Sequence, residues 1–108
     1  GRGEEQARRL RTEAMELQAA GCFAIVLECI PAEVAAEISQ SLAIPTIGIG
    51  AGPDCDGQVL VSHDMLGWGK TRFTKTFADA RTVMRSAFGA YVREVKDGTF
   101  PGKEQCYE

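Results

Sequence analysis

Residues 22–28 read CFAIVLE, a short apolar run that ends on an acid. Its apolar residues do not alternate with polar ones, so the run predicts a strand over Cys22–Leu27 that is buried on both faces. The run Pro45–Ile49 predicts a second strand. Strands of this kind are typical of parallel sheets, and they favour an α/β fold.

Helical patterns precede each predicted strand. One helix is predicted over Glu4–Ala20, with acids in its first turn and Gly21 as a stop signal. Another is predicted over Pro31–Leu42, because proline is favoured in the first helical turn. The apolar stripes are Ala7, Leu10, Ala14, Leu17 and Gly21 in the first helix and Val34, Ile38 and Leu42 in the second. The order helix, strand, helix, strand with tight connections indicates parallel βα units.

The second half of the chain has a looser pattern. The glycines of Gly48–Gly52 predict a loop, and Gln58–Val61 predicts a short extended piece. Apolar residues at helical spacing over Phe77–Val95 predict a long C-terminal helix, which Asp97-Gly98 ends. The tail, Thr99–Glu108, is predicted to be a loop.

Two strands are too few for a stable parallel sheet, since each parallel strand needs both faces covered and neighbours on both edges. The 108 residues suffice for one small core. We therefore expect residues 1–108 to be part of a single larger domain without an internal boundary, or to associate with other chains.

Composition excludes several classes of protein. The net charge of -3 and the scattered basic residues give no electrostatic reason to expect nucleic acid. The longest apolar run, Phe23–Leu27, is too short to span a membrane, and no secretory signal is visible. Cysteines 22, 29, 55 and 106 fit neither a zinc site nor a CxxC motif, so we expect free thiols in a reducing compartment. Cys22 and Cys29 are expected to behave as small buried hydrophobes.

Glu28 is the candidate catalytic residue. It ends a strand predicted to be buried, where an unpaired charge is costly. The carboxyl ends of strands form the active-site rim in barrels and open α/β sheets. A partly desolvated carboxylate at that rim is suited to general-base catalysis. A rim carboxylate paired with Arg or Lys fits the sequence equally well.

Gly48, Gly50 and Gly52 are candidates for substrate binding. Alternate glycines at a strand end let a ligand approach closely, and their amides can bind an anion. The segment is not a dinucleotide fingerprint, because the third glycine comes too early and no helix follows at once. The simpler interpretation is a tight bend from strand to loop.

Two further motifs, Gly67–Thr71 and His63-Asp64, have simpler interpretations than a functional site. Gly67–Thr71 (GWGKT) is not a phosphate loop, because the glycine that the motif requires at position 64 is Asp64, which would repel phosphate. His63 with Asp64 is only an adjacent pair, and Asp64 as the cap of a short helix is the simpler interpretation. A cysteine nucleophile is not expected, because no second histidine is available to activate it.

Five motifs, taken in order, resemble the ketopantoate hydroxymethyltransferase family. They are LECIP at 27–31, IPTIGIGAG at 44–52, DGQ at 56–58, HDMLG at 63–67 and FPG at 100–102. The resemblance runs from about Gly1 to the end of the chain, and the shared order makes it specific.

The resemblance implies a partial (β/α)₈ TIM barrel of the phosphoenolpyruvate/pyruvate type, made of the last two strands with the surrounding and C-terminal helices. It implies transfer of a hydroxymethyl group from 5,10-methylenetetrahydrofolate to 3-methyl-2-oxobutanoate, giving ketopantoate in pantothenate biosynthesis. Glu28 matches the family's proposed base, which removes the C3 proton, and Mg²⁺ stabilises the enolate. A cytoplasmic homo-oligomer is implied as well.

The resemblance also sets limits. The family's metal carboxylates, substrate lysine and substrate serine come from earlier strands, so no metal ligand is assigned to this chain and the isolated chain is expected to be inactive. Substrate-binding residues stay open, with Gly48, Gly50, Gly52 and His63 as candidates. Gln105-Cys106-Tyr107 replaces the family's usual His-Ser-Phe, and Trp68–Thr71 is unusual for it.

Two alternatives stay beside this interpretation. The chain could be a non-enzymatic assembly module derived from a barrel, which binds other copies or a partner through its unpaired strands. A small independent flavodoxin-like fold is disfavoured, because only two clear strands are predicted.

Overall fold

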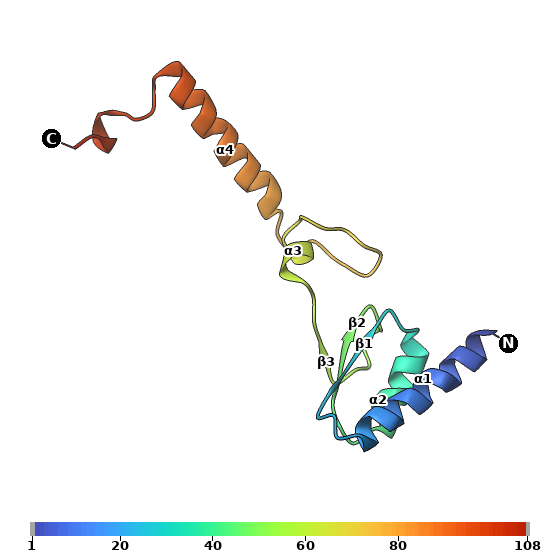
Figure 1. Cartoon of the computed structure of the whole chain (residues 1–108). Helices are drawn as coiled ribbons and strands as arrows, with labels where there is room; N and C mark the ends of the chain where they lie inside the picture. Colours follow the sequence, from blue (N-terminus) through green and yellow to red (C-terminus); the bar gives the residue numbers. More distant parts are fainter. Residues whose placement is uncertain (1, 108) are drawn as a thin grey trace. The chain divides into compact units, whose positions relative to one another are not determined.

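The computed structural model describes residues 2–107 and confirms an α/β chain with a parallel sheet. The chain forms two compact units, and the boundary lies between Leu60 and Val61 (Figure 1). Gly1 and Glu108 lie outside the described residues. No helix in the described part of the chain is both long and apolar enough to cross a membrane.

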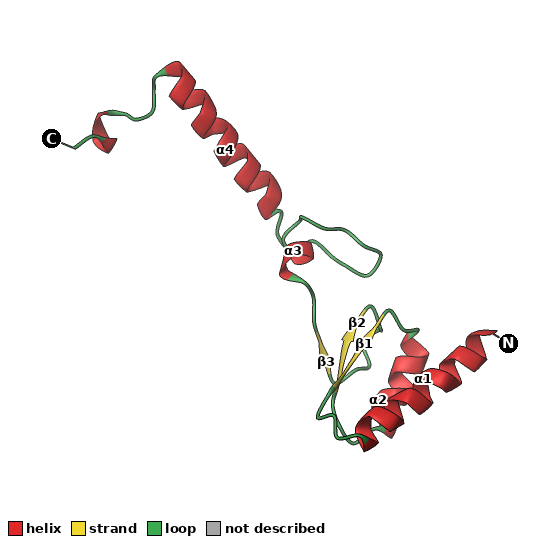
Figure 2. Cartoon of the chain, viewed as in Figure 1, coloured by secondary structure: helices red, strands yellow, loops and turns green. Residues whose placement is uncertain are grey.

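The N-terminal unit contains the sheet, which has two helices on one side (Figure 2). Its strands are parallel in the order β1-β2-β3. The third strand has two residues and overlaps the predicted extended piece Gln58–Val61 only at Gln58. The elements are α1 (Arg2–Ala19), β1 (Ile25–Glu28), α2 (Ala32–Ser41), β2 (Thr46–Ile49) and β3 (Gly57–Gln58).

The core lies between the sheet and its helices. Ile25 and Leu27 of β1 are buried there, because alternate strand residues point to the same face. They pack with residues of α1 and α2, namely Ala14, Val34, Ala35 and Ile38. The sequence predicts that β1 is buried on both faces. This prediction is wrong for this chain, because Val26 is 60% exposed. The second face is therefore open to solvent at Val26, whereas Ile47 and Ile49 of β2 are partly buried.

The two helices follow the predicted pattern with small differences. On α1, Ala14 is buried and Leu10 is partly buried, but Leu17 of the predicted stripe is 46% exposed. Gly21, with a φ of 104°, ends α1 as predicted. Pro31 is the N-cap of α2 rather than its first helical residue.

A polar cluster around the buried Thr46 fixes the start of β2. Thr46 is fully buried, and its amide donates a 2.8 Å hydrogen bond to Asp56 Oδ2. The Asp56 amide donates in return to Thr46 Oγ1 at 3.2 Å, and Ser39 Oγ lies 2.7 Å from the same oxygen. This set of three residues is called the Thr46 cluster below. It connects α2, β2 and the residue before β3, so it places the third strand.

The C-terminal unit is built from helices and loops. It contains α3 (Ser62–Met65), α4 (Ala80–Asp97) and a 3₁₀ turn, η1 (Lys103–Gln105), within the predicted tail loop. The α4 helix begins after Phe77, where the sequence predicts its start, because Asp79 caps it by accepting from the Thr82 amide at 3.1 Å. It ends at Gly98, with a φ of 77°, as predicted.

The cap also changes the acidity of Asp79. A hydrogen bond from the Thr82 side chain, then one from the Thr82 amide, and a smaller effect of Arg81 lower the pKa of Asp79 below its ordinary value of 3.8. The carboxylate form is therefore favoured at the positive end of α4.

Candidate active site

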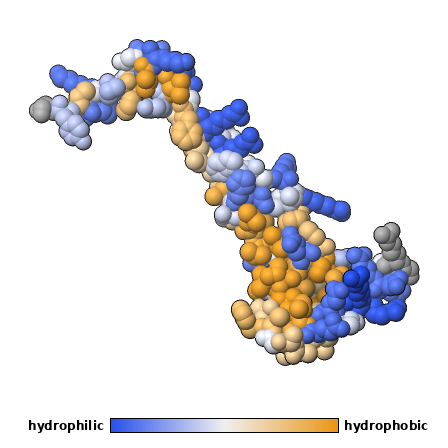
Figure 3. All heavy atoms as spheres, viewed as in Figure 1, coloured by the Kyte–Doolittle hydropathy of each residue, from blue (hydrophilic) through white to orange (hydrophobic). Residues whose placement is uncertain are grey.

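The sheet of the N-terminal unit has one uncovered face, and Glu28 lies on it. The parallel register pairs Val26 with Ile47 and Glu28 with Ile49. These residues alternate with Ile25, Leu27 and Thr46, which face the helices. Figure 3 shows hydrophobic residues gathered on the N-terminal unit. The acid thus occupies the carboxyl end of a parallel strand, on the side that a barrel turns inward.

Glu28 is exposed, whereas the sequence predicts partial desolvation. The difference arises because no described residue covers that face of β1. Within residues 2–107, the side chain of Glu28 forms neither a hydrogen bond nor an ion pair, whereas Arg9 pairs with Glu13 and Arg11 with Glu37. A structural pairing with Arg or Lys is therefore not formed by the described chain.

The backbone directly after Glu28 has an unusual conformation. Cys29 has a φ of 53°, in the left-handed region that residues other than glycine rarely adopt. Its amide donates a 2.9 Å hydrogen bond to the Ile49 carbonyl, so the β1–β2 ladder continues past Glu28. Cys29 is exposed and not buried as predicted, because the chain leaves the sheet at this residue. Strain of this kind is frequent at functional sites.

The candidate glycines have structural roles in their own unit. A Cβ atom on Gly48 would lie 2.8 Å from Cys55 Sγ, and one on Gly52 would lie 2.5 Å from Ala32 Cβ. Gly50 and Gly52 also have φ values of 65° and 83°. These contacts favour the interpretation of a tight bend, and they explain three glycines without a ligand.

His63 belongs to the C-terminal unit, whereas Glu28 and the glycines belong to the N-terminal unit. Its ring stacks on Trp68, with 6.0 Å between centroids and 22° between planes. The prediction that Asp64 caps a short helix is wrong. The N-cap of α3 is Val61 and makes no side-chain hydrogen bond, because α3 begins at Ser62 and places Asp64 within its only turn.

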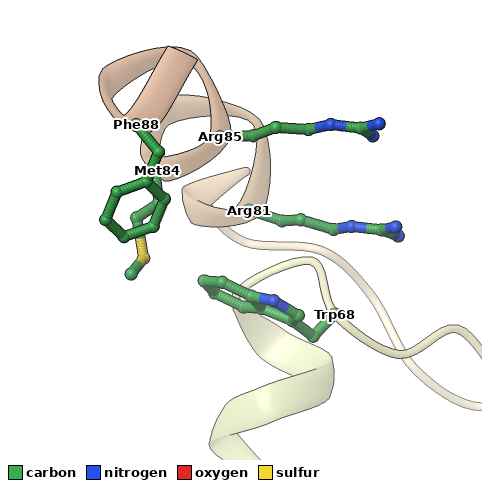
Figure 4. Close-up of a pocket in the computed structure, with 5 residues that line it drawn as sticks. All are labelled: Trp68, Arg81, Met84, Arg85 and Phe88. Atoms are coloured by element: carbon green, nitrogen blue, oxygen red, sulfur yellow. The ribbon is translucent and has the colours of Figure 1, made fainter. Parts of the chain in front are cut away.

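The same unit contains a shallow hollow of about 280 Å³ (Figure 4). It is lined by Trp68, Arg81, Met84, Arg85 and Phe88. Figure 4 shows the two arginine side chains extending in one direction, away from Met84 and Phe88. Phe88 is 64% exposed, so the hollow is open. No helix follows Thr71 directly, which agrees with rejecting a phosphate loop.

The described residues do not fit a metal site. Within residues 2–107, no group of three His, Cys, Asp or Glu side chains could hold a metal ion. The four cysteines are unpaired, with Cys22 and Cys55 partly buried and Cys29 and Cys106 exposed.

Comparison with known families identifies the chain. The profile of the family described as ketopantoate hydroxymethyltransferase matches residues 1–103. The chain belongs to this family. The matched region includes the strand that bears Glu28, the glycine segment and α4.

Curated relatives agree with that assignment. The chain is 50% identical over 111 residues to the 3-methyl-2-oxobutanoate hydroxymethyltransferase of Clostridium novyi (strain NT), covering 100% of the chain and 40% of that protein. It is 52% identical over 110 residues to that of Methylobacterium sp. (strain 4-46), covering 99% of the chain and 38% of that protein. It is 52% identical over 111 residues to that of Francisella tularensis subsp. tularensis (strain FSC 198), covering 100% and 42%. The chain thus spans about two fifths of the length of these ketopantoate hydroxymethyltransferases.

Two contacts in this member of the family were not foreseen from the sequence. The Thr46 cluster joins residues ten positions apart, and Gln58 Nε2 donates a 2.9 Å hydrogen bond to the Gly52 carbonyl. The only signal in the sequence was the motif Asp56-Gly57-Gln58, which follows the glycine loop. This motif contains Asp56 of the Thr46 cluster and Gln58, the donor to Gly52.

Proposed function

We propose that the chain supplies the general base of a ketopantoate hydroxymethyltransferase. Family membership supports the reaction class, because the curated relatives are named as hydroxymethyltransferases. The observation that carries the residue assignment is the position of Glu28 at the carboxyl end of β1, on the uncovered face. The carboxylate has no described partner that would occupy it, so it is free to accept a proton.

The proposed chemistry begins with proton abstraction. Glu28 takes the C3 proton of 3-methyl-2-oxobutanoate, and the electron pair of the broken C–H bond delocalises into the adjacent ketone as an enolate. Carbon C3 then forms a bond to the methylene carbon of 5,10-methylenetetrahydrofolate as the bond from that carbon to N10 breaks. The bond to N5 breaks as water adds its hydroxyl group to the same carbon. The proton held by Glu28 and the second proton of water go to the two nitrogens, so tetrahydrofolate leaves and the product is ketopantoate.

The proposal divides the work between this chain and the rest of a complete enzyme. A Mg²⁺ ion and the groups that hold the keto acid are proposed to belong to the portion of the longer relatives that this chain does not match, since residues 2–107 offer no ligand set. We place residues 1–108 in one (β/α)₈ barrel of the phosphoenolpyruvate/pyruvate type. The unpaired edge of β1 and the uncovered face support this placement. A cytoplasmic homo-oligomer completes the proposal.

The test uses a complete enzyme, made by placing residues 1–108 in the matching region of the Clostridium novyi relative. In D₂O without folate, it should exchange the C3 proton of 3-methyl-2-oxobutanoate, as followed by NMR. Glu28→Gln should lower both exchange and hydroxymethyl transfer by about 10²–10⁴-fold, because the base is removed. Glu33→Gln, an exposed acid on α2, is the matched control and should keep both rates. Exchange at the parent rate in Glu28→Gln would refute the assignment.

The uncovered face and free edge of β1 also favour the second candidate, an assembly module without catalysis. This candidate predicts that the complete protein with Glu28 intact assembles but neither exchanges the proton nor transfers the group. The two candidates therefore give opposite results in the exchange assay.

A further inference from the structure

We propose that Gln58 and Gly52 are positioning residues for Glu28, acting through the segment that follows it. This inference rests on the proposed function, because it assumes that Glu28 is the base. Neither residue is proposed to touch substrate. The effect arises from contacts between residues 29–32 and residues 49–52, which both leave the carboxyl ends of their strands.

Two contacts bracket the segment after Glu28. At its start, the Cys29 amide donates to the Ile49 carbonyl at 2.9 Å. At its end, Gly52 lies so close to Ala32, the first residue of α2, that a Cβ on Gly52 would be 2.5 Å from Ala32 Cβ. The residue with the strained backbone, Cys29, itself makes the first of these contacts. The conformation of Cys29 therefore depends on where residues 49–52 lie.

Gln58 fixes residues 49–52 from the other side. Its backbone pairs with Gly48 in the β2–β3 register, and its Nε2 donates a 2.9 Å hydrogen bond to the Gly52 carbonyl. Ala51, the residue before Gly52, is 1% exposed and belongs to the core. The bond from Gln58 thus holds the Gly52 backbone against Ala32. The contacts run from Gln58 through Gly52 and Ala32 to the turn that carries Glu28.

These contacts affect the distance between the carboxylate of Glu28 and the proton that it removes. A general base must lie within hydrogen-bond reach of the proton it removes, and an error of about 1 Å in a remote contact can cost about 10²-fold in rate. Gln58→Leu removes the donor to Gly52 while retaining a side chain of similar size. We expect the rate of proton exchange to fall by about 10-fold, with the KM for the keto acid within about twofold of the parent value.

The experiment compares Gln58→Leu with Gln40→Leu in the complete enzyme described above. Gln40 is exposed on α2, and its side chain makes no hydrogen bond among residues 2–107, so its variant should match the parent. The decisive readout is the primary isotope effect on hydroxymethyl transfer in H₂O, measured with C3-deuterated keto acid. A misplaced base makes proton abstraction more rate-limiting, so the isotope effect should rise in Gln58→Leu. Loss of folded protein alone would lower the rate without changing the isotope effect.

A second pair of variants tests the Gly52–Ala32 contact. Gly52→Ala should lower the exchange rate at least as much as Gln58→Leu, because it pushes Ala32 away and strains a φ of 83°. Adding Ala32→Gly removes the clashing atom and should recover part of the rate. If Glu28→Gln abolishes exchange while Gln58→Leu keeps the parent rate and isotope effect, the positioning role is refuted and the proposed function stands. If Glu28→Gln itself exchanges normally, the proposed function fails first.

Discussion

Single residues at the carboxyl end of the sheet show how tightly this rim is packed. Cys29 adopts a left-handed backbone directly after Glu28, and glycines occupy the facing segment where side chains would collide. A left-handed residue other than glycine costs about 1–2 kcal/mol, so the surrounding contacts must offset that cost. The ladder hydrogen bond from the Cys29 amide to Ile49 is one such contact.

Gly48 allows a direct test of this packing. A Cβ in Gly48→Ala would lie 2.8 Å from Cys55 Sγ and 3.3 Å from Cys55 Cβ. We expect a loss of about 1–3 kcal/mol in the free energy of unfolding, because the added methyl group overpacks a buried position. Urea denaturation measures it. In the double variant with Cys55→Ala, the sulfur is gone and part of the loss should be recovered, whereas strictly additive losses would contradict the contact.

At the scale of elements, α4 differs from the sheet unit because few of its apolar residues are buried. Val83, Phe88 and Tyr91 are 69%, 64% and 57% exposed. The stability of the helix in this chain therefore depends on its ends, where Asp79 caps the first turn and Gly98 closes the last.

The Asp79 cap predicts a dependence on pH. The folded pKa of Asp79 is depressed. The contribution of its carboxylate to the stability of α4 is therefore fully present above the ordinary pKa of 3.8, and it is lost as the pH falls through the lower folded pKa. Circular dichroism should show helix content falling in that acid range. Asp79→Ala should lower helix content already at neutral pH and remove this part of the acid transition. The exposed loop variant Asp54→Ala is the control, and an identical acid response in Asp79→Ala would contradict the cap.

The order of the helices and strands could be predicted from the sequence. Their first and last residues and the pairing of the strands could be predicted only in part. Periodicity identifies α1, α2 and the two main strands, because local patterns reflect which face is buried. It placed the start of α4 at Phe77, since it cannot see the competing cap at Asp79. It gave no sign that β3 pairs with β2, because a two-residue strand has no period.

The candidate site divides in the same way. Glu28 could be selected because an acid at the end of an apolar run is conspicuous in a sequence. The hydrogen bond from Gln58 to Gly52 could not, because it joins residues six positions apart across a loop whose course no local pattern records. Exposure of Glu28 was also missed, since burial depends on neighbours beyond the run itself.

At the scale of the whole molecule, Val26 and Glu28 on one sheet face and apolar residues of α4 such as Phe88 are exposed in the part of the chain that the structure describes. We expect the isolated chain to self-associate with rising concentration, because unpaired strand edges and apolar faces favour contact with other copies. Sedimentation velocity over a range of concentrations measures this. Val26→Lys, which places a charge on the uncovered face, should weaken association. A folded monomer at every concentration would contradict the prediction.

The Thr46 cluster has a consequence for how this region can diverge among proteins. It fixes the strands at their amino ends, whereas Glu28 and the glycine bend lie at the opposite ends. In barrels, the first location governs folding and the second governs chemistry. Residues at the carboxyl ends of the strands can therefore change during selection for a new substrate, while the Thr46 cluster at the amino ends keeps the strands in place.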